Sequence, residues 1–116
     1  WTNAQSSAQI TGAVAGNASI DNSTTLTLNG SHNVNSGSGN LANTATNAIT
    51  GLISDGTNGG KLAVTFSTTG TSNQSTQWIL SNANTYTGGT IMTRPGGSGS
   101  GVLRIGDSSA LGTGAV

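Results

Sequence analysis

The chain has 116 residues with three basic and three acidic side chains, so its formal net charge is zero, and Gly, Thr, Ser and Asn account for 67 of its residues. Three fixed positive charges exclude the basic surface that nucleic-acid binders use, and no apolar run approaches the roughly 18 residues that cross a membrane. Two Trp, one Tyr and one Phe are too few to fill a compact globular core.

The same composition favours an ordered chain with a thin core. Disordered segments usually combine high charge with many prolines, whereas here charged residues make up 5% and Pro95 is the single proline. Apolar residues reach 32% and fall in short clusters. A solenoid suits this pattern, because each coil buries only a narrow strip against its neighbours. Residues 1–116 are therefore interpreted as one segment of repetitive β structure.

Strand signals follow one another along the chain, while apolar residues at helical spacing are absent. The clearest signal is 61–66, where Leu62, Val64 and Phe66 alternate with other residues and face one way. In the last predicted strand, Arg104 points to solvent between two inward side chains. The predicted strands, in chain order, are 25–28, 48–54, 61–66, 77–80, 90–92 and 102–105.

Turn-rich segments separate these strands, at 35–40, 55–60, 68–74 and 95–101. Two arrangements fit such a series: antiparallel hairpins, as in a sandwich or barrel, and parallel coils. The hairpin signal is poor, because Asn29-Gly30 is not followed by an alternating strand. Coils of roughly 20–25 residues predict an all-β parallel β-helix (β-solenoid) of about five rungs. The expected core contains Leu62, Val64, Phe66, Leu80, Ile91, Leu103 and Ile105.

Residues 81–90 (SNANTYTGGT) and 102–116 (VLRIGDSSALGTGAV) carry a recognisable signature. In that order they resemble the passenger-associated transport repeat, also called the autotransporter-associated β-strand repeat. The resemblance covers 81–116 and implies a right-handed parallel β-helix in a large bacterial protein that is secreted or displayed on the cell surface. The family joins the two pieces by a short turn, whereas this chain inserts 93–101. We expect 94–101 to form a flexible loop outside the rungs.

Within the signature, five residues have predicted structural roles. The ring of Tyr86 can cover a corner of the coil while its hydroxyl stays in water. Gly88 and Gly89 fit a corner where a side chain would clash with the next rung. Asn82 and Asn84 are expected to form hydrogen-bonded ladders with asparagines of neighbouring rungs.

Catalytic groups are sparse. Paired catalytic carboxyl groups lie within about 10 Å of each other, and the acids Asp21, Asp55 and Asp107 are far apart in the sequence. We expect each of them to cap backbone amides in a turn. His32, the single histidine, is expected in an exposed turn, because the sequence lacks a Gly-x-Ser-x-Gly elbow between a strand and a helix: residues 97–101 (GSGSG) approach the pattern only superficially, in a glycine run without a following helix. The sequence thus predicts that the protein is not an enzyme.

A metal or phosphate site is not expected either. Asp55 and Asn58 offer two oxygen ligands, whereas Ca²⁺ takes six or more. Residues 96–103 approach the calcium-binding nonapeptide of β-rolls, but Gly101 stands where the ligand Asp belongs. No Gly-Lys-Ser/Thr follows a glycine cluster, as a phosphate-binding loop requires. The sequence therefore predicts neither metal nor cofactor.

The leading hypothesis is a structural module, a rigid stalk or self-assembling fibre element that is extracellular or on the bacterial cell surface. Neither Trp1 nor Val116 lies beside a polar cap, so we expect open end rungs, continued by further rungs of the parent protein or by another copy. The alternatives are an adhesin for glycans or host surfaces and, third, a polysaccharide-active enzyme. Trp78 and Tyr86 on an outer face would favour the adhesin, and Trp78 inside the coil would favour the structural module. Arg94 is the best-exposed candidate for a partner contact.

Overall fold

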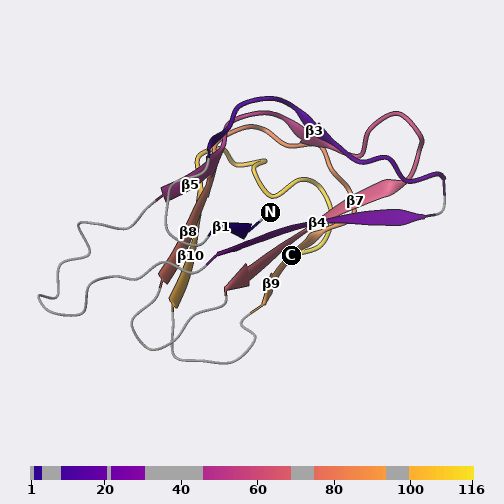
Figure 1. Cartoon of the computed structure of the whole chain (residues 1–116). Helices are drawn as coiled ribbons and strands as arrows, with labels where there is room; N and C mark the ends of the chain where they lie inside the picture. Colours follow the sequence, from indigo (N-terminus) through magenta and orange to yellow (C-terminus); the bar gives the residue numbers. More distant parts are fainter. Residues whose placement is uncertain (1, 4–8, 21, 31–45, 69–74, 94–99) are drawn as a thin grey trace, which may run out of the picture.

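The computed structural model describes residues 2–3, 9–20, 22–30, 46–68, 75–93 and 100–116 (Figure 1). This part of the chain is all β and contains no helix. Its strands are β1 (Thr2–Asn3), β2 (Gln9–Ile10), β3 (Val14–Ala15), β4 (Ser23–Gly30), β5 (Thr46–Ile49), β6 (Ile53–Ser54), β7 (Lys61–Thr68), β8 (Ser75–Leu80), β9 (Thr90–Thr93) and β10 (Ser100–Ile105).

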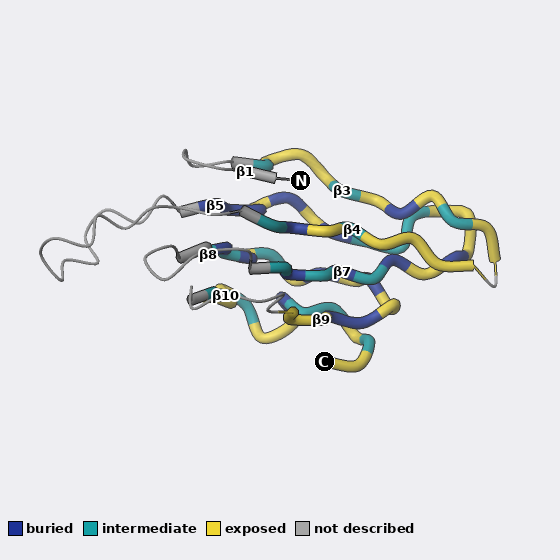
Figure 2. The backbone as a smooth tube through the Cα atoms, turned by 60° about the horizontal axis from the view of Figure 1, so that its bottom comes forward, coloured by how far each residue is buried: buried dark blue, intermediate teal, exposed yellow. Residues whose placement is uncertain are grey.

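These strands form three sheets in which every strand pairing is parallel. The first sheet has the order β1-β4-β7-β9, the second β10-β8-β5-β2, and the third β3-β6. The chain runs from the first sheet to the second and on past the third before it returns to the first. Successive passes therefore lie on one another as layers, which Figure 2 shows from the side. The prediction of an all-β fold with parallel strands is confirmed.

The hairpin arrangement that the sequence left open does not occur between the described strands. A hairpin would pair β7 with β8 in antiparallel fashion. Instead, β7 pairs with β4 and β9, and β8 pairs with β5 and β10. Neighbours in the sequence thus belong to different sheets, and the contacts within each sheet join residues that are far apart along the chain.

The layers are longer and fewer than predicted. Ser23 pairs with Lys61 and Val64 with Thr90, so one coil holds 38 residues and the next holds 26. The first and second sheets have four strands each in the described residues, which gives four layers. The described residues contain one layer fewer than the predicted five or so, because the coils of 38 and 26 residues exceed the predicted length of roughly 20–25; the coil from Ser75 to Ser100, with 25 residues, agrees with it.

Most of the variation in coil length lies where the chain crosses from the first sheet to the second. Strand β4 ends at Gly30 and β5 begins at Thr46, whereas β9 ends at Thr93 and β10 begins at Ser100. The first of these two connections is therefore the longer one. Of the expected loop at 94–101, Ser100 and Gly101 belong to β10, in register with Ser75 and Thr76. That boundary was wrong, because parallel pairing with β8 extends the strand; residues 94–99 lie outside the described residues.

The core is a thin strip between the sheets. Its fully buried members include Trp78 and Tyr86, the two largest side chains in it. Partly buried side chains, Leu103 among them, pack against the strip. Four of the seven predicted core residues, Leu62, Val64, Phe66 and Leu80, are confirmed. The cluster consists of Leu28, Ile49, Ile53, Leu62, Val64, Phe66, Trp78, Leu80, Tyr86 and Ala110.

The other three predicted core residues are not fully buried, for two different reasons. Ile91 is 52% exposed because it is in register with Thr65 on the outer face of the first sheet. Ile105 is in register with the buried Leu80 and so faces inward, yet it is 55% exposed. Its strand β10 is an edge strand of the last described layer, so no strand covers that side. Leu103 on the same strand is only partly buried.

Candidate functional site

In the described part of the chain, a group of polar side chains lies in one corner of the stack, between the second sheet and the return to the first. We call this the corner column, and it consists of 50–60, 81–89 and 106–114 from three successive layers. Backbone hydrogen bonds continue the parallel pairing of the second sheet into the corner column. Thr50 N donates to Ile10 O at 2.9 Å, Ser81 N to Ile49 O at 3.3 Å, and Gly106 N to Leu80 O at 2.7 Å. The layers are therefore also joined through their backbones where the chain enters this corner.

Asn84 connects three layers at once. Its side chain is 2% exposed. Its Oδ1 accepts a hydrogen bond from Ile53 N at 2.9 Å, and its Nδ2 donates to Ala110 O at 2.7 Å. Asn82, two residues earlier, donates from Nδ2 to Thr50 O at 3.2 Å in an exposed position. The predicted Asn–Asn ladder was wrong for both, because the adjacent layers place backbone groups opposite these amides.

Tyr86 is a core residue with a buried hydroxyl. The side chain is fully buried, and its Oη shares a hydrogen bond with Thr90 Oγ1 at 2.5 Å. Thr90 in turn donates to Leu111 O at 3.1 Å. Burial raises the pKa of Tyr86, and the hydrogen bond with Thr90 offsets part of that rise. The prediction that this hydroxyl stays in water was wrong, because the side chain is fully buried and its hydroxyl is paired with Thr90, which contacts Leu111 O.

The predicted role of the glycine pair is confirmed. A Cβ on Gly88 would lie 2.5 Å from the backbone of Leu62 in the preceding layer. Gly89 has a φ of 93°, a conformation that side chains disfavour. Both residues let adjacent layers approach closely at the corner.

Asp55 bridges two layers through its carboxylate. Oδ1 accepts hydrogen bonds from Leu62 N at 2.7 Å and from Thr87 N at 2.9 Å, and Oδ2 accepts from Thr87 Oγ1 at 2.7 Å. Desolvation acts to raise the pKa of Asp55, but these hydrogen bonds and the charge of Lys61 outweigh it and hold the pKa below its ordinary value of 3.8. The prediction that Asp55 caps backbone amides is confirmed. One of the two amides, that of Thr87, belongs to the next layer.

Asp55→Ala is expected to destabilise the chain by about 1–3 kcal/mol, because it leaves the amides of Leu62 and Thr87 without this acceptor. Asp55→Asn keeps an oxygen at the Oδ1 position and should be milder. Since the folded pKa is depressed, the carboxylate contributes stability above about pH 4, which is lost as the pH falls through the folded value. Urea unfolding at several pH values measures both effects. Equal acid sensitivity of wild type and Asp55→Asn would refute the role of the charge.

The other predicted chemical groups do not gather into a site. Asp107 Oδ1 accepts from Ser109 N at 2.7 Å, the predicted turn cap. Asn58 donates from Nδ2 to Asn17 Oδ1, so this amide and the Asp55 carboxylate both have protein partners. Within the described residues, no three His, Cys, Asp or Glu side chains lie close enough to hold a metal ion. Asp21 and His32 lie outside the described residues.

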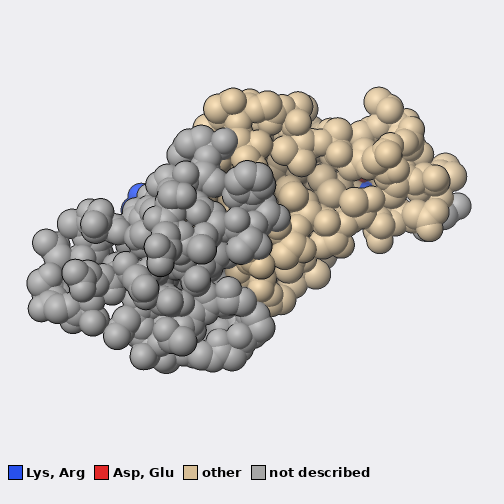
Figure 3. All heavy atoms as spheres, in the orientation of Figure 1, with Lys and Arg blue, Asp and Glu red and all other residues tan. Residues whose placement is uncertain are grey.

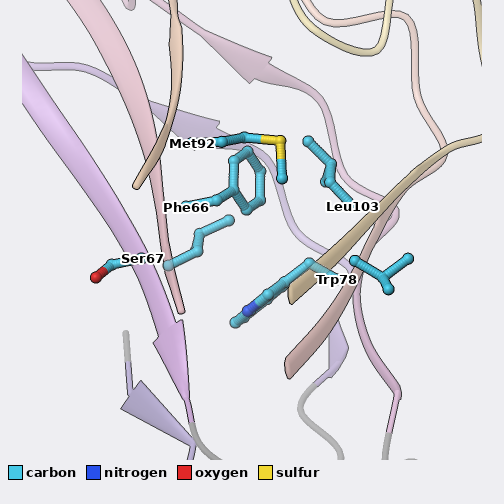
Figure 4. A pocket seen from close by; sticks show the side chains of 7 residues that line it. Phe66, Ser67, Trp78, Met92 and Leu103 are labelled. Atoms are coloured by element: carbon cyan, nitrogen blue, oxygen red, sulfur yellow. The ribbon is translucent and has the colours of Figure 1, made fainter. Parts of the chain in front are cut away.

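The aromatic surface that an adhesin would use is not formed by Trp78 and Tyr86, since they are 2% and 0% exposed. Trp78 lines a narrow apolar slot with Phe66, Met92 and Leu103 (Figure 4). The slot has a volume of about 10 Å³, and one water molecule needs about that much. Trp78 Nε1 is buried and has no hydrogen-bond partner among the described residues. A slot of this size does not admit a sugar.

Charged side chains are few on the described surface, and the face in Figure 3 shows only small patches of them. Lys61 is exposed at the start of β7, and Arg104 is exposed on the outer face of the second sheet, in register with Ile79. Arg94 lies outside the described residues. The described residues contain no helix of the length and apolar character that a membrane crossing needs.

Comparisons with protein-family models, with curated proteins and with solved structures give no match. The resemblance of residues 81–116 to the autotransporter-associated repeat therefore rests on the sequence alone.

Proposed function

We propose that the chain is a rigid structural segment of a right-handed parallel β-helix from a secreted or surface-displayed bacterial protein. One observation carries the proposal: the polar side chains of the corner column bind adjacent layers to one another. Asn84, Asp55 and Tyr86 each hydrogen-bond to protein groups of their own or neighbouring layers. Groups engaged in this way stabilise a stack and are not poised for catalysis, so the proposal assigns no enzymatic activity.

Two further arguments support this proposal. Crossover connections between parallel strands are right-handed in nearly all proteins, which agrees with the handedness that the repeat resemblance implies. Trp78 is packed inside the coil rather than on an outer face. This burial favours a structural module over the adhesin, whose binding surface was expected to include exposed aromatic rings.

The uncovered side of the last described layer, formed by β9 and β10, is suited to contact with one more coil of the same fold. Met92 is in register with the buried Phe66, and Ile105 with the buried Leu80, so both face inward. They are nevertheless 56% and 55% exposed. Inward apolar side chains at the edge of a parallel stack match the inner face of one more coil. We propose that such a coil, from the parent protein or from another copy, covers this layer.

Self-association of the chain tests this proposal. Sedimentation velocity over a range of concentrations is expected to show association through the uncovered layer. Ile105→Gln should weaken association, because it makes the inner strip polar. Ile91→Gln is the matched control, since Ile91 has nearly the same exposure but lies on the outer face. A monomer at every concentration would contradict covering of this layer by another copy, and equal weakening by both variants would contradict the role of the inner strip in either case.

A further inference from the structure

The sequence contains two Asn-Gly pairs, Asn29-Gly30 and Asn58-Gly59. In such a pair the backbone nitrogen of the glycine can attack the side-chain amide carbon of the asparagine, since glycine has no Cβ to hinder the approach. The attack requires the backbone and the asparagine side chain to rotate toward each other. The structure around each pair therefore decides whether that pair reacts.

The pair Asn29-Gly30 is held inside the first sheet. Both residues belong to β4, which lies between β1 and β7. Gly30 is in register with Asn3 of β1 and with Thr68 of β7, and the Oδ1 of Asn29 is buried. An attack by Gly30 N requires this end of β4 to separate from its neighbours first. Parallel pairing therefore protects Asn29.

The pair Asn58-Gly59 lies in the turn between β6 and β7, and both residues are exposed. An isolated antiparallel bridge joins Gly59 to Ser19, but its hydrogen bond comes from the next residue, because Gly60 N donates to Ala18 O at 3.2 Å. Among the described residues, the backbone nitrogen of Gly59 donates no hydrogen bond. This nitrogen is therefore accessible and free to attack.

We propose that Asn58 is a site of spontaneous deamidation. Gly59 N loses its proton and forms a bond to Asn58 Cγ. The bond from Cγ to Nδ2 breaks, and the side-chain nitrogen leaves as ammonia with that proton. Water then opens the resulting cyclic imide at either carbonyl carbon and leaves aspartate or isoaspartate at position 58. The net reaction consumes water and releases ammonia, with no change of oxidation state.

The reaction removes a connection between two layers. Asn17 follows β3, whereas Asn58 follows β6 in the next layer, and Asn58 Nδ2 donates a hydrogen bond to Asn17 Oδ1. The carboxylate of the product has no N–H to donate. Isoaspartate also lengthens the backbone just before Gly60, where an added Cβ would lie 2.5 Å from the Cβ of Ala18. The contact between these layers should therefore loosen at this turn, whatever the role of the segment as a whole.

Incubation of the folded chain in H₂¹⁸O, followed by peptide mapping, tests the inference, because opening of the imide places ¹⁸O in residue 58. Residue 58 should convert at least about tenfold faster than residue 29, since Asn29 reacts only in the fraction of molecules in which β4 is locally open. In urea the two residues should convert at similar rates. Equal rates in the folded chain, or conversion of residue 58 only after unfolding, would overturn the inference.

Two variants separate the reaction from its consequence. Asn58→Gln keeps an amide donor but closes a larger ring more slowly, so residue 58 should not convert measurably in the same incubation. Asn58→Asp represents one product. Hydrogen exchange at Gly60 N, which donates to Ala18 O, should be several-fold faster in Asn58→Asp than in Asn58→Gln. Equal exchange in the two variants would contradict the loosening of the layers, and conversion of Asn58→Gln at the wild-type rate would contradict the attack by Gly59 N.

Discussion

Trp78→Ala is expected to destabilise the chain by about 3–5 kcal/mol, the range for removing a buried large aromatic side chain. Among the described residues, Trp78 is the largest fully buried side chain, and it packs in the strip between the first and second sheets. Because the core is only one strip wide, the layers on either side offer few other side chains to fill the cavity. Urea unfolding followed by circular dichroism measures the loss, which is a large part of the 5–15 kcal/mol typical of a folded domain.

Trp78→Phe is the control for this prediction. It keeps an aromatic ring in the strip and removes the indole Nε1, which has no partner among the described residues. A loss of about 1–2 kcal/mol is expected, well below that of the alanine variant, since less apolar volume disappears and no hydrogen bond to a described residue is broken. If alanine and phenylalanine were tolerated equally well, Trp78 would not be in the core.

Asn84→Ala is expected to have the second largest effect, a loss of about 2–4 kcal/mol, because two buried backbone groups lose their partners. These groups are Ile53 N in the preceding layer and Ala110 O in the following one. A buried donor or acceptor without a partner bears the full desolvation penalty. The same unfolding experiment measures this loss.

Asn82→Ala provides the matched comparison within the same segment. Asn82 also donates from its amide to a backbone oxygen of the preceding layer, but that hydrogen bond is exposed. Water can replace it, so a loss of less than about 1 kcal/mol is expected. Similar losses for Asn82→Ala and Asn84→Ala would contradict the role of Asn84 as a buried connection between layers.

The strands that could be predicted are those whose side chains alternate strictly. In 61–66 the pattern assigned Leu62, Val64 and Phe66 to the inner face, and all three are buried. In 90–92 two apolar residues are adjacent, so the pattern does not choose between Ile91 and Met92. In the structure, pairing with β7 places Ile91 opposite Thr65, on the outer face of the first sheet. Strands β1, β2 and β3 have two residues each, which is too short for an alternating pattern of apolar and polar side chains to be recognised.

The contacts of the corner column could not be predicted, because they depend on which residues of different coils lie on one another. Asp55 and Thr87 are 32 residues apart, whereas Asn84 and Ala110 are 26 apart. The coils differ in length, so no fixed spacing in the sequence identifies these partners. Residue type alone did predict that Asp55 and Asp107 accept hydrogen bonds from backbone amides and that Gly88 and Gly89 allow close approach.

Disulfide trapping tests the parallel stacking of layers most directly, and the chain contains no cysteine that would interfere. Thr65 and Ile91 are register partners on the outer face of β7 and β9. Adjacent strands lie about 4.8 Å apart, within the Cα separation that a disulfide accepts. Thr65→Cys with Ile91→Cys should therefore form an intramolecular disulfide under mild oxidation, whereas Thr65→Cys with Ile79→Cys should stay reduced. The opposite result, a disulfide between positions 65 and 79 and none between 65 and 91, would indicate a hairpin of β7 with β8 and contradict the stacked parallel layers.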